Sequence, residues 1–254
     1  MSIKSKVLAA AATLTLVGGV GVAGALTAGP AAAGTPSCGP SCINLFNKDF
    51  APANLTGGAS SGPSSPVDVF RQGERTGQPI ILFRSSNSDP AMDWSASFQG
   101  VARDLCPGGA NGAIGLLSAA TCLHYGDDFA FENAYTPFGV FSGLCLGVAA
   151  TAFQNEGVTL QPCGVSGRTI WIVDDNESFF HNFPGVPLIN GSNTNFSHPF
   201  VLTYPANANP TDIPRVQLKV TNLTGFTQPG GHHFPVISSV SSSQLWLRTF
   251  GVLP

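Results

Sequence analysis

The sequence repeats a set of short, strand-like apolar runs three times, and each repeat ends on a tryptophan. In the first unit Leu82 follows Val69 by 13 positions, and Trp94 comes 12 positions later. In the second unit the matching intervals are 12 and 11 positions, and the unit ends on Trp171; a third unit ends on Trp246. All three tryptophans of the chain therefore occupy one point of a threefold repeat, which restricts the chain to folds built from three equivalent units. The runs lie at residues 67–69 and 77–82, 146–148 and 157–160, and 200–204 and 216–218.

The composition agrees with an all-β chain that has many turns. The runs have the length of strands and are separated by turn residues, of which the chain has Gly 30 and Pro 20. Charged residues make up 10% of the chain, against roughly 25% in an average domain, so the charged faces of long surface helices are missing. A hydrophobic fraction of 43% excludes a disordered chain, since disorder requires low hydrophobicity.

The order of these motifs resembles the ricin-type β-trefoil lectins. The second unit has Cys-Leu-Gly-Val at 145–148 and Val-Thr-Leu-Gln-Pro-Cys at 158–163, and the third ends with Gln244, Trp246 and a final Phe250. The resemblance covers residues 66–250, with insertions at 104–141 and 222–243. It implies a divergent β-trefoil in which Trp94, Trp171, Gln244 and Trp246 have structural roles; the alternative is another disulfide-stapled β-sandwich.

The resemblance also implies one candidate sugar site, in the first unit. Asp68 stands at the position of the family's sugar-binding carboxylate, and Phe83 stands at that of its stacking aromatic ring. A carboxylate accepts hydrogen bonds from sugar hydroxyls, and an aromatic ring packs against the apolar face of the sugar. Met92 replaces the family's amide. The second and third units have lost these residues, since Gly147, Gln161 and Lys219 stand at the matching positions.

The six cysteines predict three disulfides, because an even number of cysteines in an exported chain is typical of a disulfide framework. Six cysteines allow 15 pairings, and the nearest-neighbour scheme is the simplest. It joins Cys38 to Cys42, Cys106 to Cys122, and Cys145 to Cys163; the family resemblance implies the last of these pairs. No zinc-type spacing of cysteine and histidine is present in the sequence, and we expect no metal and no cofactor.

The N-terminus has the pattern of a signal peptide. Lys4 and Lys6 precede a long apolar stretch that ends in small residues near Ala33. The sequence thus predicts a signal peptide over 1–33, a flexible Gly/Ser/Pro-rich arm over 34–65 and the trefoil-like domain over 66–254, and hence a secreted protein. Without the two lysines, nine basic residues face 14 acidic ones, a formal charge of −5. This excludes binding to nucleic acid or, after signal cleavage, to an anionic membrane.

These observations favour a secreted, non-catalytic binding protein with weak carbohydrate recognition through the first unit. The alternative is a protein-interaction or inhibitor module that contacts another secreted protein through residues 104–141. A secreted hydrolase is the third hypothesis. The acidic residues Asp127, Asp128 and Glu132 are interpreted as a solvated acidic turn, and not as a catalytic or calcium-binding cluster.

Overall fold

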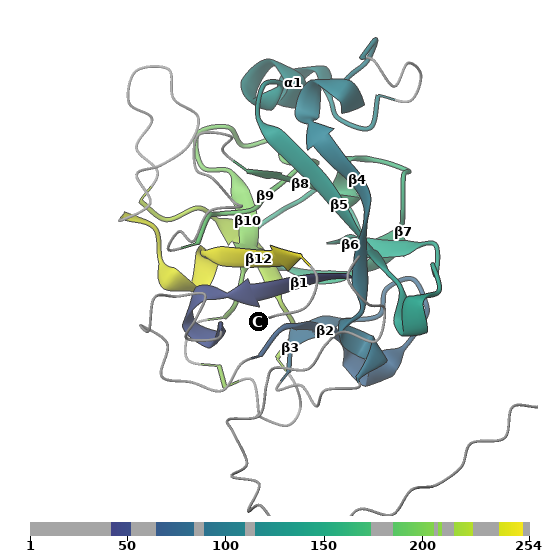
Figure 1. Cartoon of the computed structure of the whole chain (residues 1–254). Helices are drawn as coiled ribbons and strands as arrows, with labels where there is room; N and C mark the ends of the chain where they lie inside the picture. Colours follow the sequence, from purple (N-terminus) through teal and green to yellow (C-terminus); the bar gives the residue numbers. More distant parts are fainter. Residues whose placement is uncertain are drawn as a thin grey trace, which may run out of the picture. The chain divides into compact units, whose positions relative to one another are not determined.

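The computed structural model describes residues 42–51, 65–83, 89–109, 115–173, 185–205, 208–209, 216–225 and 239–250 (Figure 1). The predicted signal peptide and Cys38 lie outside these ranges. Within them, no helix has the length and hydropathy needed to cross a membrane. The strands are β1 (Cys42–Asn47), β2 (Val67–Val69), β3 (Ile80–Leu82), β4 (Trp94–Val101), β5 (Phe129–Tyr135), β6 (Leu144–Val148), β7 (Glu156–Pro162), β8 (Ile170–Val173), β9 (Ile189–Asn190), β10 (Phe200–Thr203), β11 (Lys219–Asn222) and β12 (Trp246–Phe250). One α-helix, α1 (Ala119–Tyr125), and short 3-10 helices lie between the described strands; the latter include η4 (Pro90–Met92), η6 (Pro137–Gly139) and η7 (Gly167–Thr169).

Six strands pair in a ring. β1 pairs with β4, β4 with β5, β5 with β8, and β8 with β9, all antiparallel. The ring closes where β12 pairs with β1 and where Val186, just before β9, bridges to Trp246. In Figure 1, β1 and β12 run side by side. Closure removes the free strand edges that a short-stranded sheet would otherwise expose.

The other six strands form three hairpins, β2–β3, β6–β7 and β10–β11. Each hairpin also contacts the other two. β7 pairs with β11, and bridges join Pro79 to Thr159 and Ile81 to Gln217. A six-stranded barrel with three mutually paired hairpins divides the chain into the four-strand units β1–β4, β5–β8 and β9–β12. This arrangement is a β-trefoil and confirms the predicted fold class.

Each repeat tryptophan joins a barrel strand to the hairpin of its own unit. The indole Nε1–H of Trp94 donates to the Val67 carbonyl over 3.1 Å, and that of Trp171 to the Leu146 carbonyl over 3.0 Å. The indole of Trp246 donates to the Leu202 carbonyl over 2.8 Å. All three rings are buried. Spacing in the sequence therefore located a hydrogen bond that occurs once in every unit.

Gln244 has a structural position in the third unit. Its side chain is 1% exposed, and its Oε1 accepts hydrogen bonds from the backbone N–H and the hydroxyl of Thr224, each over 2.8 Å. Its Nε2 donates to the Asn222 carbonyl over 2.8 Å and to the Thr221 hydroxyl over 2.9 Å. The amide thus ties the end of β11 to the segment before β12.

Two predicted boundaries need correction. The arm was expected to extend over 34–65, but β1 lies within it, where Ile43 and Leu45 are buried in the core. The first unit needs β1 as a barrel strand, so the domain includes residues before 66. The insertion expected at 104–141 likewise contains β5, which pairs with both β4 and β8.

The structure confirms two of the predicted disulfides, Cys106–Cys122 and Cys145–Cys163. The first joins η5 (Ala102–Leu105) to α1 and fastens the remaining part of the insertion. The second connects β6 to the residue after β7, so it clips the two strands of one hairpin together. The third predicted pair involves Cys38 and lies outside the described residues.

Replacing Trp171 by Phe tests the repeated hydrogen bond. The substitution leaves the buried Leu146 carbonyl without its donor, and an unsatisfied buried polar group costs about 1–3 kcal/mol. We expect the free energy of unfolding, measured by urea denaturation, to fall by at least that amount. Phe153→Leu is the control, since Phe153 is an exposed aromatic. Equal losses in the two variants would contradict a structural role for the indole N–H.

Candidate functional site

The first-unit pair, Asp68 and Phe83, lies on one face of the β2–β3 hairpin. Asp68 is paired with Ile81, and since side chains alternate along a strand, Phe83 shares their face. The opposite face carries Val67 and Leu82, which belong to the core. The structure thus brings the two predicted residues to one side, but Asp68 is only 2% exposed and Phe83 is half-buried.

The surroundings of Asp68 are acidic and closed. η4 packs against β2 and is buried, including Met92 at the amide position. Burial raises the pKa of Tyr135 above its ordinary value, and Glu74, Asp68, Asp89 and Asp93 raise it further. A 2% exposed carboxylate offers little surface to the hydroxyls of an incoming sugar.

In the second unit, another segment of the chain leaves no room for a side chain at Gly147, which stands where the first unit has Asp68. A Cβ atom at Gly147 would lie 2.8 Å from the backbone oxygen of Arg168 and 2.8 Å from Cγ2 of Thr169. The chain before β8 approaches β6 too closely for an Asp at this position. Because Gly147 has no side chain, the segment that contains Arg168 can lie close to β6.

Glu132 is not part of a solvated acidic turn, and that interpretation was wrong. It lies on β5 with 3% exposure and accepts hydrogen bonds from the Ser97 hydroxyl over 2.7 Å and from the Gly164 N–H over 2.9 Å. The Thr169 hydroxyl is a further donor. Its carboxylate also approaches Cys145 and Cys163, but these sulfurs are bonded to each other and offer no thiolate to a metal. Glu132 instead joins β4, the loop after β7, and η7.

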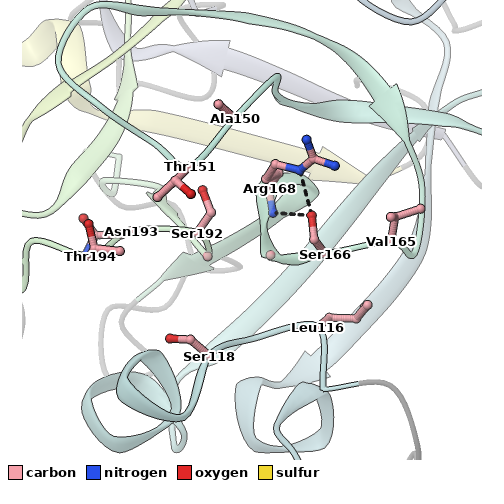
Figure 2. A pocket seen from close by; sticks show the side chains of 12 residues that line it. Leu116, Ser118, Ala150, Thr151, Val165, Ser166, Arg168, Ser192, Asn193 and Thr194 are labelled. Atoms are coloured by element: carbon pink, nitrogen blue, oxygen red, sulfur yellow. Dashed lines mark hydrogen bonds between the residues drawn. The ribbon is translucent and has the colours of Figure 1, made fainter.

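An open groove of ≈ 600 Å³ lies where loops of the second and third units meet. Ala150 and Thr151 come from the β6–β7 loop, residues 165–168 from the segment before β8, and residues 191–194 from the segment after β9. Leu116 and Ser118, just before α1, add a wall from the insertion. Figure 2 shows the side chains. The lining residues are Leu116, Ser118, Ala150, Thr151, Val165, Ser166, Gly167, Arg168, Gly191, Ser192, Asn193 and Thr194.

Arg168 is held in place on one side of the groove. Its Nε–H donates to the Ser166 hydroxyl over 2.9 Å, and Nη1 donates to the Ala149 carbonyl over 2.5 Å. The same Ser166 hydroxyl accepts from the backbone N–H of Arg168, as the N-cap of η7. Figure 2 shows both bonds between Arg168 and Ser166. These contacts fix the plane of the guanidinium group.

The opposite side of the groove is built on Asn190, which is completely buried. Its Nδ2 donates to the Arg168 carbonyl over 3.0 Å, and its Oδ1 accepts from the Ser192 hydroxyl over 2.6 Å. The Ser192 oxygen in turn accepts from the Ala152 N–H over 3.0 Å. Asn190 therefore sets the distance between the two walls, whereas Thr151 and Thr194 on this side are exposed.

Two glycines let the walls meet below the groove. A Cβ atom at Gly167 would lie 2.6 Å from the Gly191 oxygen, and one at Gly191 would lie 2.9 Å from the Gly167 oxygen. Both distances are too short for any larger residue unless the backbone moves. The groove floor is thus a contact of two backbones.

Sequence reasoning missed this groove. Its residues come from four segments, two in the second unit, one in the third unit and one just before α1, and they form no motif at any fixed spacing. The only local signal is the run of small polar residues Gly-Ser-Asn-Thr at 191–194, which is also typical of an ordinary turn. Only the barrel and hairpin pairing brings these segments together.

No family model and no curated protein matches the sequence. Among solved structures, the chain is similar to the designed 3-fold symmetric protein ThreeFoil, with 11% identity, a TM-score of 0.46, and coverage of 82% of this chain and 98% of that one. It is also similar to the Rhizoctonia solani agglutinin, with 12% identity, a TM-score of 0.42, and coverage of 83% and 96%. A Caenorhabditis elegans protein with unknown function has 13% identity, a TM-score of 0.42, and coverage of 85% and 96%. Membership of the lectin family is not shown by these comparisons, and the β-trefoil assignment rests on the chain's own strand pairing.

Replacing Gly167 by Ala tests the backbone contact below the groove. The added methyl group must displace residues 167 and 191, and overpacking of this kind costs about 1–3 kcal/mol. We expect a lower free energy of unfolding and altered amide chemical shifts at 166–169 and 191–194. Gly164→Asn is the matched control, because Gly164 has space around it and a positive φ, which Asn tolerates. Unchanged shifts in Gly167→Ala would contradict the close approach.

Proposed function

We propose that this chain is an exported, non-catalytic binding protein that takes a hydroxyl-rich ligand of the carbohydrate class in the groove beside Arg168. One observation carries the proposal: a groove of ≈ 600 Å³ in which six hydroxyl or amide side chains and one guanidinium converge from loops. Ligand sites commonly have volumes of roughly 300–1,000 Å³ and a few convergent polar groups.

The chemistry of the lining fits a sugar. Thr151 and Thr194 carry exposed hydroxyls that can both donate and accept hydrogen bonds, as sugar hydroxyls also do. Leu116 and Val165 supply small apolar surfaces for the C–H groups of a sugar ring. The groove is open to solvent and has no aromatic residue in its lining, so we expect a dissociation constant for one monosaccharide on the order of 1 mM, which is about −4 kcal/mol.

The lining also favours binding over hydrolysis. Its twelve residues include no carboxylate, histidine or cysteine. A glycosidase places two carboxylates on either side of the scissile bond, and general acid–base catalysis needs a titratable group near the reacting atoms. The groove therefore lacks the groups on which the hydrolase hypothesis depends.

Export is supported by the covalent structure. Cys106–Cys122 and Cys145–Cys163 are disulfides, and such bonds persist mainly in oxidising, extracellular environments. The signal peptide over residues 1–33 is a prediction from the sequence alone. Edman sequencing of the secreted protein would test it by locating the cleavage site.

An NMR titration with a panel of monosaccharides tests the proposal and separates the two candidate sites. We expect amide shifts at 150–151, 166–168 and 192–194, and an affinity weaker by about fivefold to 150-fold when Thr151 and Thr194 are both replaced by Val, because two exposed hydroxyl partners are lost at about 0.5–1.5 kcal/mol each. Asp68→Asn should leave binding unchanged. Binding that depends on Asp68 and Phe83 would place the sugar in the first unit, and no response to any sugar would contradict carbohydrate binding.

A second candidate function, protein interaction, is favoured by one exposed apolar turn. Phe138, Val140 and Phe141 are 71%, 68% and 58% exposed, within the segment 104–141 that sequence analysis assigned to partner contact. Exposed apolar side chains that cluster in this way are typical of interaction surfaces. The turn contains no charged residue from 136 to 143.

This turn has a fixed conformation. The backbone N–H of Phe138 donates to Oδ2 of the buried Asp93 over 3.1 Å, and Thr136 donates to the Asp93 carbonyl. Phe138 has a φ of 54°, a left-handed conformation that is strained for an aromatic residue. Because the turn is already held in one conformation, its side chains lose little conformational entropy when a partner binds.

Replacing Phe138 by Asn and Phe141 by Ser tests the turn. Asn tolerates the left-handed conformation, so the domain should keep its stability or gain a few tenths of a kcal/mol. We expect loss of any protein captured from culture supernatant by the wild-type chain, while sugar titrations remain unchanged. Leu123→Ser is the control, since Leu123 is 82% exposed on the same insertion. Capture that survives the double substitution would contradict a role for the turn.

A further inference from the structure

The groove beside Arg168 has an unbalanced charge. Arg168 is the one charged residue among the twelve that line it. A neutral-sugar site of the type expected at Asp68 uses a protein carboxylate to accept hydrogen bonds from the ligand, and this groove has the opposite charge. The negative partner of the guanidinium is therefore missing from the lining.

The structure offers Arg168 no carboxylate partner among the described residues. The one ion pair of this part of the chain joins Arg103 to Asp127. Glu132 and Glu156 contact the surrounding loops, but they are 3% and 7% exposed. Glu132 accepts from the Gly164 N–H and Glu156 from the Ala150 N–H, so both carboxylates are bonded to the backbone of the groove walls.

The guanidinium retains donors for a ligand. Nε and one hydrogen of Nη1 are used by Ser166 and the Ala149 carbonyl, and a guanidinium has five N–H groups. Nη2 makes no hydrogen bond to any residue in the described ranges. Arg168 is half-buried, so a charge that it meets is less screened by water than at a fully exposed site.

The geometry points to a sugar that carries its own carboxylate. We propose that the Arg168 groove prefers uronic acids, with the ligand carboxylate on the guanidinium and the ring hydroxyls toward Thr151 and Thr194. A guanidinium and a carboxylate form two parallel hydrogen bonds, which gives direction as well as attraction. The inference rests on the proposed function of the same groove and specifies its ligand class.

Matched pairs of sugars test this preference. D-glucuronic acid with D-glucose, and D-galacturonic acid with D-galactose, differ at C6 by a carboxylate in place of a hydroxymethyl group. We expect NMR titrations of the full chain at pH 7 to show about tenfold tighter binding of each acid than of its neutral partner, which corresponds to about 1.4 kcal/mol. The preference should shrink as salt is added, because the attraction is partly screened.

Variants locate the preference at Arg168. Arg168→Gln should abolish the difference between acid and neutral sugar, and Arg168→Lys should keep part of it, since lysine retains the charge without the planar fork. Arg71→Gln, an exposed arginine outside the groove, should leave the difference intact. If Arg168→Gln does not fold, Arg168→Lys and the salt series on the unaltered chain still decide the matter.

The outcomes separate the two proposals. Equal binding of acids and neutral sugars, or an acid preference that survives Arg168→Gln in a folded protein, overturns the uronic acid inference and leaves carbohydrate binding standing. Acetate that binds as tightly as the uronic acids also overturns it, because the hydroxyl wall would then contribute nothing. Absence of binding by all four sugars overturns both.

Discussion

The buried hydrogen bond between each repeat tryptophan and its hairpin is the interaction on which the rest of the structure depends. The indole of Trp94, Trp171 or Trp246 fills the space between barrel and hairpin, and its N–H reaches a carbonyl of the hairpin's first strand. A large ring with one polar tip fixes both the distance between the barrel and the hairpin and their relative orientation. Because the bond occurs once in each unit, the three hairpins are held against one barrel in the same way, and the loops between strands can vary.

The groove beside Arg168 is an example of this freedom. Nothing in its lining belongs to the repeated tryptophan contact, and Asn190, Gly167 and Gly191 serve only to bring two loops close together. Gly147 has a similar role, since the absence of a side chain there makes room for the segment that contains Arg168. In the second unit, the absence of a side chain at Gly147 thus allows the segment that carries Arg168 to lie against β6.

Spacing in the sequence predicted the features that are local. The hairpins, the tryptophans and two disulfides each join residues within a few tens of positions, so their intervals are visible along the chain. β1 was assigned to the flexible arm because its partner, β12, lies far away in the sequence; the Asn47 side chain bonds to the Leu245 carbonyl across 198 positions. Glu132 was misjudged because three donors from other segments bury it. The groove escaped notice for a similar reason, since four short polar segments have no common period.

The pairing of β1 with β12 has a consequence for how the domain is made. The barrel cannot close until both strands are present, and loop closure over so long a segment is slow compared with the formation of a hairpin. Until β12 docks, β1 is paired with β4 on one side only, and its other edge can pair with another chain. A chain truncated before β12 would therefore leave the barrel open at β1 and be prone to aggregation through that edge.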